Sequence, residues 1–207
     1  MSIFNVLSVI ILSQLLLIIF AIRVMSFKKD SFIWLFLSFF VETFFGSALG
    51  QQVIFSQYIK EFAVELPELI IAITGVFLLF KNKENIIKLT NKTLAISFSI
   101  ALVCVIYSQF IYAYAQNFYA GIPVTTLILI ISIAIFSIAN YMGYILLMQK
   151  YALGFLLNAI FFLQALIING YYLIHYPNYS LAVKFITSSI LAIIFLTGYI
   201  KNKKYTI

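Results

Sequence analysis

The sequence predicts an all-α integral membrane protein with seven transmembrane helices, arranged as two parallel three-helix repeats joined by a linker helix. Three observations predict this fold class. Apolar residues make up 64% of the 207 residues and charged residues 9%, whereas soluble domains are about half apolar and about a quarter charged. Long apolar segments alternate with short basic ones. Short sequence matches also recur in the same order in both halves of the chain.

Seven apolar segments are long enough to cross a bilayer, which takes roughly 20 mostly apolar residues. In order they are 3–24, 31–50, 62–80, 94–115, 124–148, 151–174 and 181–200. The first lacks a basic N-terminal region and a small-residue cleavage site, so we interpret it as a spanning helix and not as a signal peptide. The third opens with Glu65, Pro67 and Glu68, which suit a first helical turn. We therefore expect its membrane part to begin near Leu66.

The basic residues set the expected orientation. If all seven segments cross the membrane, eleven of the thirteen basic residues fall on one side. They are Arg23, Lys28, Lys29, Lys81, Lys83, Lys88, Lys92, Lys150, Lys201, Lys203 and Lys204. Because positive residues concentrate in cytoplasmic loops, we expect the N-terminus outside and the C-terminus in the cytoplasm. The net charge of +7 is thus explained by a membrane partner, and no dense basic patch indicates nucleic acid.

The internal matches have nearly the same spacing. They pair Thr74-Gly75 with Thr197-Gly198, the segment 39–42 with 161–164, and Lys29 with Lys150, at offsets of 121 to 123 residues. This pattern divides the chain into a first repeat (1–92), a linker helix (93–121) and a second repeat (122–207). One helix between two three-helix units keeps both in the same orientation, and transporters bind cargo between such repeats.

Glu42 is the acidic residue that the expected spans place nearest mid-membrane. A carboxylate there costs several kcal/mol unless it is neutralised, paired or hydrated, so such residues commonly face a cargo or proton path. The alternative is a protonated Glu42 that holds two helices together. In the repeat, Gln164 corresponds to Glu42, and Trp34 corresponds to Phe155. We expect a small-molecule substrate to be held between the carboxyl and the amide.

A second polar group lies on the fifth and sixth expected spans. It consists of Asn140 with its neighbour Tyr141, Asn158 and Gln164. Buried amides also hold helices together, at about 0.6 to 2 kcal/mol each, so a structural role and a binding role both remain open for each residue. As a set in a transporter, we expect at least one or two of them to contact cargo.

Other functional classes have weaker support in the sequence. His175 is the sole histidine and Cys104 the sole cysteine, so we expect no metal site, no catalytic pair and no enzyme activity. No glycine-rich phosphate loop is present, and we expect no cofactor. A lysine in the last of seven helices, here Lys184, is also a feature of retinal proteins, in which it forms a Schiff base. The expected place of Lys184 near the outer surface instead suits a side chain that reaches toward water.

The chain resembles the bacterial nicotinamide riboside transporters of the PnuC family, which share the three-one-three plan of SWEET-type proteins. The resemblance is best over residues 123–204. There Thr125-Thr126-Leu127 opens a helix, a short basic turn at Lys150 leads to a helix with Asn158, and Thr197-Gly198-Tyr199 precedes a basic tail. In the first half, Lys28-Lys29-Asp30 precedes Trp34. Phe155 and Asn158 stand where the family typically carries two tryptophans.

The resemblance implies a function and a location. It implies uptake of a vitamin or nucleoside-like solute across the bacterial cytoplasmic membrane by facilitated diffusion. It further implies trapping of the cargo by a cytoplasmic kinase, a homo-oligomer, and Trp34 and Phe155 as aromatic walls of the site. The alternative is a substrate-binding membrane subunit of a larger, energy-coupled transporter.

Overall fold

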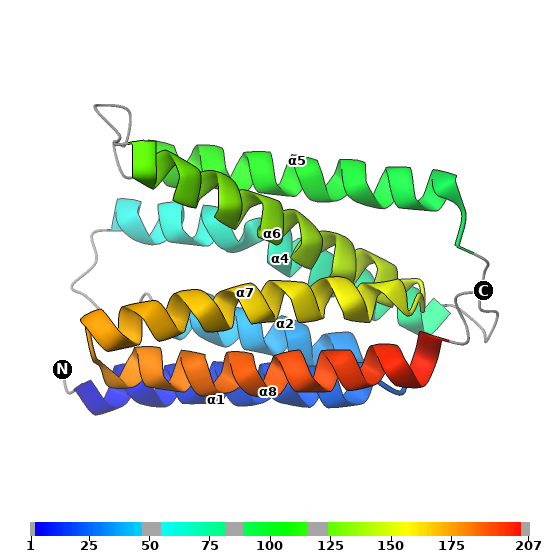
Figure 1. The fold of residues 1–207 in the computed structure, drawn as a ribbon, viewed down its shortest axis with the longest axis horizontal. Helices are drawn as coiled ribbons and strands as arrows, with labels where there is room; N and C mark the ends of the chain where they lie inside the picture. The colour runs from blue at the N-terminus through cyan, green and yellow to red at the C-terminus, as the bar shows by residue number, and fades with distance from the viewer. Residues whose placement is uncertain (1–2, 47–54, 82–88, 116–123, 204–207) are drawn as a thin grey trace.

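The computed structural model describes residues 3–46, 55–81, 89–115 and 124–203, and in these ranges the chain is helical without a strand. The helices are α1 (Ile3–Val24), α2 (Ser31–Val41), the π-helical turn η1 (Glu42–Gly46), α4 (Phe55–Lys81), α5 (Asn91–Ala115), α6 (Val124–Met148), α7 (Leu153–His175) and α8 (Tyr179–Asn202). They run alternately along one long axis, so that α1 begins at one end of the bundle and α8 finishes at the other (Figure 1). The all-α prediction is confirmed for these residues.

Five of the described helices, α1, α5, α6, α7 and α8, are long and apolar enough to cross a membrane. The apolar stretch Ser31–Phe45, formed by α2 and η1, is shorter. Many large apolar side chains face outward, including Phe77, Ile167 and Ile174 with about three quarters of their surface exposed (71%, 72% and 79%). An outward apolar surface of this kind suits lipid rather than water.

The helices pack in a regular order. α2 contacts both α1 and α4, and α7 contacts both α6 and α8. The first group (α1, α2 and α4) and the second group (α6, α7 and α8) meet along two seams, because α1 contacts α8 and α4 contacts α6. α5 lies at one edge of the bundle, against α4 and α6 (Figure 1). The first helix of each group therefore meets the third helix of the other.

The turns that follow α1 and α6 have the same backbone structure. Phe27 and Lys150 have positive φ angles of 48° and 63°, and each ends its helix in a Schellman-type cap. The cap hydrogen bonds run from Phe27 N to Val24 O, Lys28 N to Arg23 O, Lys150 N to Leu147 O and Tyr151 N to Leu146 O, at 2.8 to 3.2 Å. Each of these backbone hydrogen bonds in one turn has its counterpart 123 residues away in the other.

Two glycines let neighbouring helices approach closely. A Cβ atom on Gly75 of α4 would lie 2.2 Å from the Phe32 ring of α2. A Cβ atom on Gly198 of α8 would lie 2.7 Å from the Phe155 ring of α7. Both rings are fully buried. The threonine before each glycine donates to a carbonyl one turn back, at 2.8 Å in both cases.

The expectation for the third span was wrong at its start. α4 begins at Phe55 and contains Pro67 inside the helix, so the helix neither begins at 62 nor places its acidic residues in a first turn. Glu68 instead stands halfway along α4. Its carboxyl group finds a partner on α6, described below, and this tertiary contact overrides the preference of acids for helix N-termini. Pro67 has no N–H for the carbonyl of Ala63, which weakens the helix at that point.

One further expectation needs correction, and one contact is new. The helix expected over 31–50 is α-helical only to Val41 and continues as η1, and residues 47–50 lie outside the described ranges. Because α8 begins at Tyr179, Lys184 stands in its second turn. Its Nζ lies 3.7 Å from Oε1 of Glu42, and 41% of its side chain remains exposed. This ion pair was not expected from the sequence, and its exposure makes its contribution to stability modest.

We predict that Gly75→Ala and Gly198→Ala each destabilise the protein by about 1 to 3 kcal/mol, because each added methyl group overlaps a buried ring. Thermal unfolding in detergent measures this. Gly170→Ala is the matched control, since its Cβ would lie 3.1 Å from the outer edge of the Phe185 ring and should change stability little. Equal unfolding midpoints for all three variants would contradict the packing described here.

Candidate functional site

A polar cluster lies where α4 meets α6. Glu68 of α4 lies within interaction range of Tyr141 of α6 and of Glu65, one turn away on its own helix. The Tyr141 hydroxyl group also lies 3.4 Å from Oγ of Ser108 on α5. Tyr141 is 5% exposed, so these polar groups meet inside the bundle. Three helices thus contribute to one polar group.

The cluster extends along α6 toward the other half of the molecule. The side chain of Asn140 lies within interaction range of Tyr144, one turn further along the helix. Tyr144 is almost fully buried, and its ring contacts Phe20 of α1 and Phe39 of α2, with ring centroids 5.7 and 6.4 Å apart. Tyr144 also lies within electrostatic range of Glu68. The tyrosine therefore links the polar cluster to the aromatic core.

Glu42 stands at the margin of this cluster. It opens the π-helical turn η1, which contacts both α1 and α4, and its carboxyl group lies within electrostatic range of Glu68. Its ion pair with Lys184 joins η1 to α8. Single π-helical turns frequently occur at functional sites. The turn changes the backbone geometry at the position of the Glu42 carboxyl group.

Two buried amide oxygens lack hydrogen-bond partners among the described residues. Oδ1 of Asn140 and Oδ1 of Asn158 are both inaccessible and unpartnered there. Nδ2 of Asn158 donates to the carbonyl of Gly154 at 3.0 Å, and its amide packs against Gly143 of α6. A buried unsatisfied acceptor costs about 1 to 3 kcal/mol. The two oxygens can accept hydrogen bonds from a ligand or from water.

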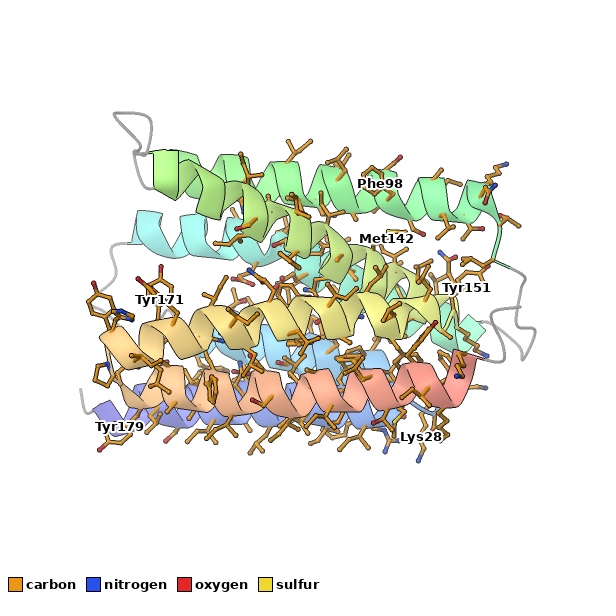
Figure 2. All side chains as sticks on the ribbon, in the orientation of Figure 1. Lys28, Phe98, Met142, Tyr151, Tyr171 and Tyr179 are labelled. Carbon is orange, nitrogen blue, oxygen red and sulfur yellow. The ribbon has the colours of Figure 1, made fainter. Side chains whose placement is uncertain are left out.

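The structure separates Trp34 and Phe155 from the polar cluster. Nε1 of Trp34 donates to Asp30 at 3.2 Å, beside the turn between α1 and α2. Phe155 is fully buried near the same end, with its ring centroid 5.5 Å from that of Phe27. Figure 2 shows Lys28 and Tyr151 at this end of the bundle and Tyr171 and Tyr179 at the opposite one.

Of the residues expected at a binding site, Asn140 and Tyr141 lie in the cluster and Glu42 lies at its margin. Asn158 lies on the adjoining α7, and Gln164 is partly exposed further along that helix. Glu65 and Glu68 were not expected as site residues. Their spacing was the available signal, because residues three apart share one helix face. Ser108 carried no such signal.

A cavity of about 460 Å³ lies between α4, α5 and α6. Leu66 and Pro67, which stand between Glu65 and Glu68 in the sequence, line one part of it, and Met148 and Gln149 at the end of α6 line another. The remaining lining is mostly apolar and includes Tyr107 of α5. The cavity therefore connects the level of the polar cluster with the end of the bundle that carries the basic turns.

An ion pair stabilises the turn between α1 and α2. Nη2 of Arg23 donates to Asp30 at 2.6 Å, and this hydrogen bond lowers the pKa of the Asp30 carboxyl group below its usual value. The pair is about one third exposed on both sides. Its contribution to stability is therefore modest.

Comparison of the chain with protein-family models, with curated proteins and with solved structures gave no match. The function proposed below therefore depends on the geometry of the polar cluster and on the sequence resemblance alone.

We predict a measurable coupling between Glu42 and Lys184. Lys184→Gln leaves the carboxylate of Glu42 without its partner and should destabilise the protein more than the double change Glu42→Gln/Lys184→Gln. The coupling free energy from the double-mutant cycle should be on the order of 1 kcal/mol, since the pair is partly exposed. Thermal unfolding in lipid nanodiscs gives the four values. Additive effects would show that the contact contributes nothing.

We predict a stability effect of Asp30→Asn that depends on pH. Because the pKa of Asp30 is lowered on folding, its contribution is present above the unfolded value of about 3.9 and disappears as the pH falls through the folded value. Asp30→Asn should therefore cost about 1 kcal/mol or less at neutral pH and nothing in strong acid. Lys29→Gln, an exposed change in the same turn, should shift stability little at either pH.

Proposed function

We propose that the protein is a small uptake transporter for a vitamin or nucleoside-like solute in the bacterial cytoplasmic membrane. The observation that carries the proposal is the polar cluster inside an apolar helix bundle, together with two buried amide oxygens that lack partners among the described residues. Polar groups at this depth are costly and usually line a cargo or ion path. Amide and carboxyl oxygens suit a cargo that carries hydroxyl or amine donors.

The proposed architecture is seven spans in two parallel repeats, with boundaries at 1–92, 93–121 and 122–207. Three features support it, namely the equivalent capped turns, the equivalent glycine contacts and the equivalent packing order in the two halves. The residues that correspond in the capped turns and in the glycine contacts are 123 positions apart in the sequence. In this register Phe155 corresponds to Phe32 and not to Trp34, and Glu42 corresponds to Ala165 and not to Gln164.

The two helices outside the five apolar ones complete the seven proposed spans. α4 has 27 residues, which at 1.5 Å per residue is enough to cross a bilayer, and its mid-helix carboxyl group has partners inside the bundle. α2 and η1 continue one another across the same bundle. The basic turns at Lys28 and Lys150 then share one side with the end of α8, which is the proposed cytoplasmic side.

The proposed mode of transport is facilitated diffusion between the two repeats, with a cytoplasmic kinase that phosphorylates the cargo and so retains it. The cluster residues Asn140, Tyr141 and Glu68 and the neighbouring Asn158 would contact the cargo directly. The alternative, a substrate-binding subunit of a larger transporter, has the same site and differs in requiring a partner. Transport by the purified chain in liposomes separates the two.

We predict that cargo raises the unfolding temperature of the purified protein, because a ligand that binds only the folded state stabilises it. The panel is nicotinamide riboside, thiamine, riboflavin and deoxynucleosides. Uptake of the stabilising compound into liposomes is the functional measurement. A panel in which no compound stabilises the protein and none enters the liposomes would count against the proposal.

Asn158→Leu is the sharpest variant for this site. Leu35, at the corresponding position of the first half, is fully buried, so leucine is compatible with such a position. The change removes an unsatisfied acceptor and should keep or raise stability, while cargo affinity should fall about tenfold or more if a hydrogen bond to cargo is lost. Loss of stability with unchanged affinity would assign Asn158 a structural role. Asn169→Leu on the same helix, whose Nδ2 donates to Ser188, is the matched control.

A further inference from the structure

The cavity between α4, α5 and α6 opens toward the outer surface of the bundle. Its floor consists of buried apolar residues, namely Ile71 of α4 and Ile145 and Met148 of α6, each no more than 5% exposed. Its rim includes Ile70 of α4 and Val103 of α5, which are 53% and 66% exposed. A lining that is buried at depth and exposed at the rim forms a groove in the apolar surface of the bundle. We call this cavity the α4–α5–α6 groove.

The course of α6 explains why the groove is present. α6 begins beside the end of α5 and crosses the bundle obliquely toward the start of α7 (Figure 1). It lines the groove only with residues near its end, Ile145, Met148 and Gln149, whereas α5 contributes residues between Ile100 and Tyr107. The groove therefore lies where α6 has moved away from α5.

The equivalent end of the α1–α8 seam is closed by polar contacts. Nδ2 of Asn202, at the end of α8, donates to the carbonyl of Met25 at 3.1 Å, and Nζ of Lys201 lies 3.5 Å from Oγ of Ser26. At the offset of 123 residues, Leu78 of α4 stands in place of Lys201. Leucine has no hydrogen-bonding group, and Leu78 lines the groove. The chain thus closes one seam by itself and leaves an apolar space beside the other.

Two lysines stand at the end of the groove where α5 begins and α6 ends. Lys92 is the second residue of α5, and Lys150 directly follows Gln149, which lines the groove. Neither lysine has an ion-pair partner in the part of the chain that the structure describes. Phe27 occupies the position that corresponds to Lys150 in the other half, so the shared turn does not require a positive charge. Basic sites between membrane helices on the cytoplasmic side suit the headgroups of anionic lipids.

We propose that the α4–α5–α6 groove binds an anionic phospholipid, with an acyl chain in the groove and the phosphate group beside Lys92 and Lys150. The groove opens on the surface that faces the bilayer, so acyl chains are the apolar groups that reach it. Its volume of about 460 Å³ lies within the range of roughly 300 to 1,000 Å³ that is usual for small-molecule sites.

The occupant differs from the proposed cargo. A cargo rich in hydroxyl or amine donors would find few acceptors in this mostly apolar lining, whereas an acyl chain needs none. The inference therefore adds a lipid partner to the proposed transporter and does not depend on which solute it carries.

Lipid titration of the purified, delipidated protein in detergent tests the headgroup site. Unfolding midpoints are measured with dioleoylphosphatidylglycerol, with dioleoylphosphatidylcholine and with inorganic phosphate. The anionic lipid should bind saturably and about tenfold or more tighter than the neutral one, because two lysines face its phosphate. Inorganic phosphate should leave the midpoint unchanged. Equal affinity for the two lipids, or equal stabilisation by phosphate alone, overturns the proposal.

A charge variant locates the headgroup. Lys150→Asn should weaken binding of the anionic lipid about fivefold, the factor that corresponds to about 1 kcal/mol for one lysine near the membrane surface. Asparagine tolerates the positive φ angle of 63° at this position. Lys28→Gln, a change of an exposed lysine in the other capped turn, is the matched control and should keep the affinity. Equal losses in both variants would show general attraction to the basic end and overturn the site.

Alkylation of Cys104 tests the position of the acyl chain. Cys104 lines the groove and is the sole cysteine of the chain, so its reaction with N-ethylmaleimide, measured by intact mass, needs no engineered label. Saturating dioleoylphosphatidylglycerol should slow this reaction. Val103→Trp, which fills the rim, should abolish both the protection and the stabilisation by lipid. Ile106→Trp, which lies on the same helix outside the groove and is similarly exposed at 59%, should keep both.

The outcomes separate the lipid from other occupants. An unfolding midpoint of Val103→Trp near that of the wild type without lipid shows that the variant is folded. Lipid that binds without protecting Cys104, or protection that survives in Val103→Trp, overturns the proposed place of the acyl chain. A delipidated protein that is dimeric with Cys104 protected, and that becomes monomeric in Val103→Trp, assigns the groove to a second copy of the chain and overturns the lipid site.

Discussion

Placement of the Glu68 carboxyl group halfway along α4, within interaction range of Tyr141 on α6, is the constraint on which the arrangement of α4 and α6 depends. A carboxyl group in an apolar interior is costly unless it is neutralised, paired or hydrated, and Tyr141 and Glu65 are the groups beside Glu68. The same tyrosine contacts Ser108 of α5, so Tyr141 links α5 and α6 beside a carboxyl group of α4. Replacement of Tyr141 by an apolar residue would leave a buried acid without its partner on α6.

The two halves of the bundle share a backbone frame and differ in the side chains placed on it. Phe27 and Lys150, whose backbone has the left-handed conformation, end the first helix of each half in the same way. Gly75 and Gly198 let the third helix of each half approach a phenylalanine of the second. These contacts depend on backbone shape and small volume, so both halves need them. The polar groups concentrate along one of the two equivalent seams, which is why that seam and not its counterpart is the candidate for function.

Much of the helical frame could be predicted, because long apolar segments and basic turns are local features of the chain. The start of α4 could not. Glu65 and Pro67 are typical of a first helical turn, and nothing local indicates that Tyr141, more than seventy residues away, supplies a partner for Glu68. The site was predictable to the same degree. Asn140 and Tyr141 stood out as polar residues in an apolar segment, whereas the pairing of Lys184 with Glu42 depends on how α8 lies against η1.

The sequence by itself determined the class of protein and the approximate spacing at which similar helices recur. It could do so because the length of an apolar segment, its flanking charges and its glycines are properties of a single helix or of two neighbouring helices. Only the tertiary structure decided which carboxyl group lies beside Tyr141, which carboxyl group meets Lys184 and which of two similar seams is polar. Those outcomes depend on distances between helices far apart in the chain. Desolvation cost and hydrogen-bond geometry change over a few ångströms, and a linear sequence does not specify distances at that scale.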